Sequence, residues 1–147
     1  MKLLQAIEVR KLVEPAAVND NTAFTTDTID TKGYAECMFI IQFGAMDIAA
    51  AVFKLKESDD SGMSGAVDVT GADFSVSPLT LPSATDDHHL FGIHVLCGGP
   101  RKRYLDLSFT AGDGAVGTYA SGVVLLASAS KTLPAASLQG FTQLACV

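Results

Sequence analysis

The sequence lacks tryptophan altogether and is poor in charged residues, which make up 18% of its 147 positions. It also lacks any apolar run that reaches the roughly 18 residues of a membrane-spanning helix. Charged residues recur every few positions in the N-terminal segment, without the apolar core of a secretion signal. We therefore expect neither a membrane protein nor an exported one, and we expect synthesis in a cytoplasm.

Basic residues are scarce as well. Ten lysines and arginines face 16 acidic residues, so the formal net charge is −6. A nucleic-acid-binding protein needs a basic face to contact phosphates. The missing tryptophan and the few tyrosines also leave little material for stacking on bases. We expect no nucleic-acid partner.

Cysteine is limited to three widely spaced positions, and no C-x-x-C motif occurs. Cys37, Cys97 and Cys146 have apolar neighbours. This pattern favours buried or half-buried free thiols over a disulfide or a nucleophile, in a protein made in a reducing compartment.

Short segments of alternating polarity dominate what is present. The length suits one domain, and 48% hydrophobic residues can supply its core. The predicted strands cover residues 34–43, 48–56, 67–69, 74–76, 89–97, 103–109, 118–127 and 138–147. Segment 118–127 is apolar on both faces, which suggests a central strand. Turn signals rich in glycine, proline and aspartate separate the segments. We predict an all-β protein, an antiparallel β-sandwich that is jelly-roll-like, with one domain over residues 24–147.

The first 23 residues differ from the rest. Glu8, Arg10 and Lys11 interrupt the apolar positions, which fits an extended N-terminal arm or an edge strand. The only dense basic cluster is Arg101–Lys102–Arg103, at a junction between a loop and a strand. Both groups are candidate contacts with a partner or a neighbouring subunit. The alternative for the N-terminal group is an ordinary first strand, and the alternative for the basic cluster is a solvated loop.

The motifs that resemble catalytic or ligand-binding sites do not meet the requirements of those sites. Residues 112–117 match G-x-G-x-x-G, but the β-like continuation offers no helix for a pyrophosphate, so a hairpin turn is the better interpretation. Within one strand, the spacing of His88, His89 and His94 prevents a shared metal ion, and a site formed by His88, Asp86 and a second chain is the alternative. The 59–62 turn lacks the ligand spacing of a calcium loop, and Ser64 lacks a nucleophile elbow. We predict no catalytic residues, no cofactor and no metal.

The chain nevertheless resembles a known family. The residues that carry the resemblance lie in segments 55–62, 84–87, 101–107 and 111–119. They are similar to those of capsid decoration (cement) proteins of short-tailed bacteriophages, over about residues 28–127. The shared motifs are turns and strands, so no catalytic position is implied. The resemblance implies a compact β-sandwich that sits on the outside of the phage head as a homodimer or homotrimer and bridges major capsid protein subunits.

We therefore expect a virion structural protein on the capsid exterior, assembled in the host cytoplasm. Its expected partners are the major capsid protein and further copies of itself, with no membrane partner. The alternative is a β-sandwich module of a phage fibre that binds carbohydrate or a host surface. An enzyme is not expected, because no set of acid, base and nucleophile emerges.

Overall fold

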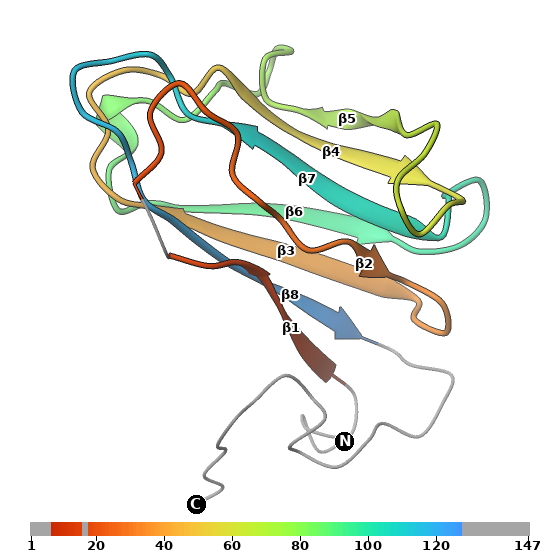
Figure 1. Cartoon of the computed structure of the whole chain (residues 1–147). Coiled ribbons are helices and arrows are strands. Elements are labelled where there is room, and N and C mark those ends of the chain that lie inside the picture. The colour runs from red at the N-terminus through yellow and green to blue at the C-terminus, as the bar shows by residue number, and fades with distance from the viewer. Residues whose placement is uncertain (1–6, 16–17, 128–147) are drawn as a thin grey trace, which may run out of the picture.

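The computed structural model describes residues 7–15 and 18–127, and strands make up nearly all of its regular structure. The strands form two antiparallel sheets of four strands each, which pack face to face (Figure 1). Sheet I has the order β1-β8-β3-β6, with β1 (Ile7–Val13), β8 (Ala120–Ala127), β3 (Glu36–Phe43) and β6 (Leu90–Leu96). Sheet II has the order β2-β7-β4-β5, with β2 (Ile29–Asp30), β7 (Tyr104–Thr110), β4 (Val52–Ser58) and β5 (Val67–Asp73). The predicted all-β antiparallel sandwich is confirmed.

The N-terminal segment forms an edge strand rather than a free arm over residues 7–13. β1 pairs with β8 from Ile7 opposite Ala127 to Val13 opposite Gly122. The chain then crosses to sheet II, where the Phe24 N–H donates to a β7 carbonyl at 2.9 Å. β8 is flanked by β1 and β3, as its apolar character predicted. The strand predicted over residues 138–147 lies outside the described residues.

One predicted strand is wrong, because residues 74–76 form a turn. The Asp73 carboxylate accepts hydrogen bonds from the backbone N–H and the hydroxyl of Ser75, at 2.9 and 2.7 Å. The Val76 N–H donates to the Asp73 carbonyl at 3.2 Å. An aspartate that bonds to the backbone two residues ahead ends a strand and begins a turn. Its side chain overrides the β propensity of the phenylalanine and valine that follow.

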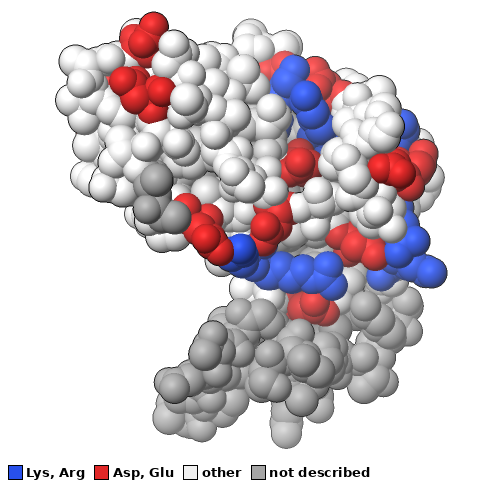
Figure 2. All heavy atoms as spheres, in the orientation of Figure 1, with Lys and Arg blue, Asp and Glu red and all other residues white. Residues whose placement is uncertain are grey.

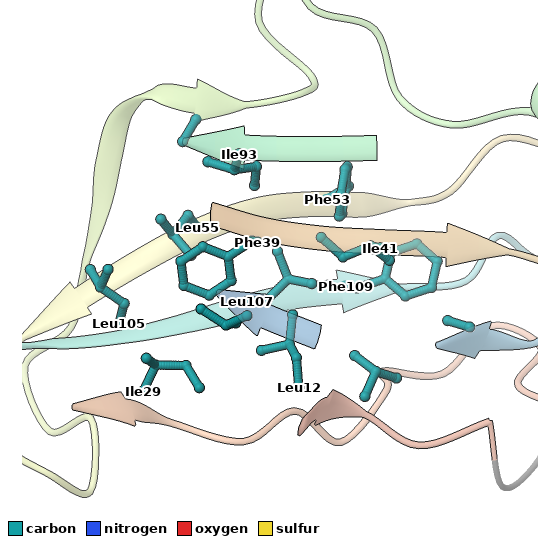
Figure 3. Close-up of a cluster of buried hydrophobic side chains, with 14 of the residues drawn as sticks. Leu12, Ile29, Phe39, Ile41, Phe53, Leu55, Ile93, Leu105, Leu107 and Phe109 are labelled. Carbon is teal, nitrogen blue, oxygen red and sulfur yellow. The ribbon is translucent and has the colours of Figure 1, made fainter. Parts of the chain in front are cut away.

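The core fills the space between the two sheets. Inward side chains of both sheets converge there (Figure 3). The Phe43 ring of sheet I stacks on the Phe109 ring of sheet II, with the ring centroids 4.7 Å apart. The Phe53 ring meets the Phe43 ring edge-on at 5.4 Å. The rings thus join the two sheets through favourable aromatic geometries.

Helical structure is minimal. The described residues include a short 3-10 turn, η2 (Ala84–Asp86). Within residues 7–15 and 18–127, no helix has the length and apolar character needed to cross a membrane.

The core arrangement predicts a large effect of Phe109→Ala. Phe109 is 1% exposed, so truncation leaves a cavity between the sheets. We expect the free energy of unfolding, measured by urea titration, to fall by about 3–5 kcal/mol. Val76→Ala serves as the control, because Val76 is 59% exposed; its effect should stay within about 0.5 kcal/mol. Equal losses in the two variants would contradict this account of the core.

Candidate interaction surfaces

The charged residues predicted on β1 occupy different environments. Glu8 is buried, with 6% of its surface exposed. It accepts a hydrogen bond from the Tyr34 hydroxyl and another, at 2.7 Å, from Arg10 Nε. Burial and this bond raise the pKa of Tyr34 to about 12. Lys11 is exposed and forms ion pairs with Glu14 and Asp27 at 2.6 and 3.2 Å. Of these β1 residues, Lys11 is therefore the most accessible to a partner.

The basic cluster lies at the opposite end of β7 from the 111–119 loop, and its arginines are paired within the chain. Arg101 Nη1 lies 3.1 Å from the carboxylate of buried Glu57, which also accepts the Lys102 backbone N–H. Arg103 donates two hydrogen bonds to Asp30, at 2.8 and 2.7 Å. The Lys102 side chain has no ion-pair partner among the described residues. The two arginines thus tie the 97–103 loop to the sandwich.

Asp30 brings the two groups of predicted contact residues together. Its carboxylate binds Arg103, and its backbone carbonyl accepts a hydrogen bond of 3.5 Å from Arg10. The Arg103 guanidinium lowers the pKa of Asp30 to about 2. Arg10 lies on β1, Asp30 on β2 and Arg103 directly before β7, so the three are far apart in the sequence. No sequence pattern predicted Asp30 or Glu57 as partners of the arginines.

The outer face of sheet I carries a cluster of apolar side chains, with polar ones at Glu36, Gln42 and His94. The register places Val9, Leu125 and Met38 in one row across the sheet, and Val123 beside Ile40 in the next. On the edge strand β6, Leu90 is 68% exposed and Leu96 is 69% exposed. We call this surface the sheet I face: Val9, Met38, Ile40, Leu90, Leu96, Val123 and Leu125.

A groove runs along part of the sheet I face. It has a volume of about 390 Å³, and its lining includes apolar Ile40, Leu90 and Val123 and polar Lys11 and Gln42. The groove has room for an apolar side chain of a partner. An exposed apolar patch rimmed by polar residues marks a contact site in soluble proteins.

Sheet II follows the usual alternation and shows what is unusual about sheet I. Its outward positions on β4 and β7 include Lys54, Lys56, Asp106 and Ser108. Lys54 Nζ forms an ion pair with Asp68 at 2.7 Å. Antiparallel sheets normally place polar residues on the face turned to water. Sheet I does so only in part, because its outward positions Glu36, Gln42 and His94 are polar and those between them are apolar.

The loops at one end of the sandwich carry acidic residues without basic ones. These loops are residues 18–22, 44–51, 74–89 and 111–119, and we call this surface the acidic loop end. It contains five aspartates, Asp20, Asp47, Asp86, Asp87 and Asp113, and no lysine or arginine. Figure 2 shows red without blue at the upper left end of the molecule and nearly all the blue toward the right. The charge is therefore polarised along the strands.

Exposed apolar side chains accompany the acidic residues. Val18, Ile48 and Val116 are 45%, 46% and 62% exposed. Val116 belongs to the 111–119 loop, and Val18 and Ile48 lie against it, since a β carbon at Gly117 would meet Val18 and one at Gly112 would meet Ile48, each under 3 Å. The Asp47 carboxylate accepts N–H bonds from Ala115 at 2.5 Å and Val116 at 2.9 Å. These contacts hold the apolar tips in a defined arrangement.

The 112–117 loop corrects one expectation and agrees with another. It joins β7 of sheet II to β8 of sheet I, and these strands do not pair. The loop is therefore a connection between sheets and not a hairpin turn. A strand, and not a helix, follows it, so the helix N-terminus required by a dinucleotide site is missing at this place.

Histidines take part in ordinary surface contacts. His94 Nε2 lies 2.8 Å from the Glu36 carboxylate on the neighbouring strand, and His89 Nδ1 lies 3.9 Å from Asp86. Among residues 7–15 and 18–127, no three histidine, cysteine, aspartate or glutamate side chains are grouped to hold a metal ion.

Comparisons with known proteins add no relative. No protein-family model matches the chain, and no curated protein matches it significantly.

The Asp30–Arg103 pair predicts a specific acid response of Asp30→Asn. Because the pKa of folded Asp30 is lowered to about 2, the pair stabilises the fold above its usual pKa and loses this effect as the pH falls toward about 2. Water screens this half-exposed pair, so the variant should lose only about 0.5–1 kcal/mol at neutral pH. Urea titrations from neutral pH downward should show this difference shrinking between about pH 4 and pH 2.

Asp59→Asn is the matched control, because Asp59 is exposed and forms no ion pair within the described residues. A difference between wild type and Asp30→Asn that stayed constant over the whole pH range would refute the role of the pair.

Proposed function

We propose that this chain is a virion structural protein that decorates the outside of a tailed-phage capsid and bridges major capsid protein subunits. The sheet I face is the observation that carries this proposal. An exposed apolar patch on the outer face of a β-sandwich is typical of a site where another protein binds. The residues described above do not call for a catalytic role.

The strand order supports the proposal. We interpret β1-β8-β3-β6 and β2-β7-β4-β5 as an eight-stranded jelly roll, an architecture common among viral capsid and lectin domains. A fold by itself does not define a function. The resemblance of segments 55–62, 84–87, 101–107 and 111–119 to decoration proteins points in the same direction.

The two surfaces suit different partners. The sheet I face is mostly neutral, so a second copy can pack on it without repulsion between like charges. The acidic loop end would repel its own copy, and it suits a capsid protein surface with basic residues around an apolar recess. We assign self-association to the sheet I face and capsid contact to the acidic loop end.

The size of the sheet I face favours binding in a lattice. Strand spacings of about 4.8 Å and rises of about 3.3 Å give four strands of seven residues an area of roughly 440 Å². A stable interface usually covers about 800 Å² on each partner. Self-association through this face is therefore weak in solution, and it becomes effective where a capsid holds many copies side by side.

The central experiment mixes the purified protein with expanded heads that lack it, pellets the heads, and counts bound copies. A decoration protein saturates at hundreds of copies per head and raises the resistance of the heads to heat. Absence of binding to every head form would refute the proposal.

The sheet I face predicts reduced binding by the double variant Leu90→Glu/Leu96→Glu. Both side chains are about two-thirds exposed, so the fold should tolerate the change. Two buried charges at the contact should lower apparent affinity for heads at least roughly tenfold. Thr70→Glu, on exposed β5 of sheet II, is the control and should bind like the wild type. Equal binding by the double variant would exclude this face.

The acidic loop end predicts a separate effect of Val116→Lys. This exposed tip should lose its apolar contact and meet the basic rim of the capsid protein with a like charge. Sedimentation equilibrium should show unchanged self-association, while head binding falls at least roughly tenfold. Val67→Lys, on β5 of sheet II and 47% exposed, is the control and should bind heads like the wild type. Loss of self-association in Val116→Lys would contradict the division of roles.

A carbohydrate-binding module is the second candidate, and one observation favours it. Tyr34 is buried and Tyr104 lies beneath the Arg103 guanidinium, whereas Tyr119 is 51% exposed within the acidic loop end. An exposed aromatic ring is a usual platform for a sugar. A glycan array probed with the intact protein separates the candidates, since glycan binding without head binding would favour the module.

A further inference from the structure

Two cysteine thiols lie together at the edge of the core. Cys37 on β3 is 1% exposed, and Cys97 directly after β6 is half-buried. Their sulfur atoms are 3.8 Å apart. Cys37 is opposite Val95 in the register, and the Cys97 N–H donates to the Ala35 carbonyl at 2.8 Å. The two cysteines are thus diagonal neighbours on the same side of an antiparallel pair.

The two thiols differ in access and acidity. Cys97 reaches solvent, and its hydrogen bond with Cys37 lowers the pKa of Cys97. The same contact, together with burial, raises the pKa of Cys37. The thiolate is the reactive form of cysteine. Cys97 is therefore the sulfur that an external reagent meets first, and Cys37 is positioned to react second.

The backbone beside Cys97 can supply the remaining movement. A disulfide requires sulfur atoms about 2.0 Å apart, so the pair must close by roughly 1.8 Å from its separation of 3.8 Å. Cys97 lies beyond the last residue of β6. Gly98 and Gly99 follow it with φ of 85° and 63°. A glycine pair outside the hydrogen-bonded strand adjusts more easily than a residue within the ladder.

We propose that Cys37 and Cys97 are a redox-active pair that forms a disulfide when the protein leaves a reducing compartment and meets a low-molecular-weight disulfide. The Cys97 thiolate attacks one sulfur of the reagent, forms a mixed disulfide and releases one thiolate. Cys37 loses its proton and attacks the Cys97 sulfur, which releases the second thiolate. The two protein thiols lose two electrons, the reagent gains them, and the thiol protons pass to the two released thiolates.

The disulfide would fix β6 to β3 at the edge of sheet I. It would close a long loop, since the two cysteines are 60 positions apart in the sequence with β4 and β5 between them, and such loops gain most from a cross-link. β6 also carries Leu90 and Leu96 of the sheet I face. The pair would therefore stiffen that face after release from the cell. This proposal does not depend on the proposed capsid role.

The test uses the full chain with Cys146→Ser, so that the two thiols of interest are the only ones present. Oxidised glutathione is the probe. We expect the intact mass to fall by two hydrogen atoms and a peptide map to join Cys37 to Cys97. The melting temperature should rise by about 10 °C and return to its starting value with dithiothreitol.

Single variants test the order of the steps. Cys37→Ala should accumulate the mixed disulfide at Cys97, because no second thiol can resolve it. Cys97→Ala should leave buried Cys37 unmodified in the folded protein. Two free thiols after oxidation, a stable glutathione adduct in the chain with both cysteines, or an unchanged melting temperature would each overturn the proposal.

Discussion

The aromatic contact between the sheets is the constraint on which the other features depend. Phe43 comes from β3 of sheet I, and Phe53 and Phe109 come from β4 and β7 of sheet II. Their rings meet at centroid distances between 4.7 and 5.8 Å. Phe24 also stacks on Phe109 at 4.7 Å, which fixes the segment that leads from β1 to β2. These rings hold one sheet over the other, and the surfaces discussed above lie on the two sheets and on the loops between them.

The two outer faces then diverge. Sheet II has charged pairs toward water, as a solvated sheet should. The sheet I face carries apolar side chains on the outside of the sandwich, and their exposure to water is unfavourable. A weak face of limited area is a useful property for a protein that must assemble with many copies on a lattice, since repetition supplies the strength that a single contact lacks. The acidic loop end gives the molecule a second surface with a different sign and a different partner.

The charged residues beside the basic cluster illustrate how an interface prediction changes with structure. Arg101 and Arg103 have carboxylate partners on β4 and β2, so both have a structural role in their loop. Glu8 is turned inward, toward Tyr34. Lys11 and Lys102 remain the members of the predicted set with the most freedom to meet a partner. The capsid contact predicted for the set stays a prediction.

Local patterns in the sequence determined the class of the fold. Side chains alternate between the two faces along a strand, so the alternating polarity of residues 36–43 and 104–110 predicted these strands without tertiary information. The sequence also showed that segment 118–127 is apolar on both faces. This indicated a strand with a neighbour on each side, but it does not explain why the side chains on the outer face of the sheet are apolar. Tertiary structure decided which segments share a sheet, that β7 and β8 lie in opposite sheets, that Asp30 meets Arg10 and Arg103, and that Cys37 lies beside Cys97. These contacts join residues 20 to 73 positions apart, and alternation carries no information about partners at such separations, because it specifies a face and not the segment that faces it.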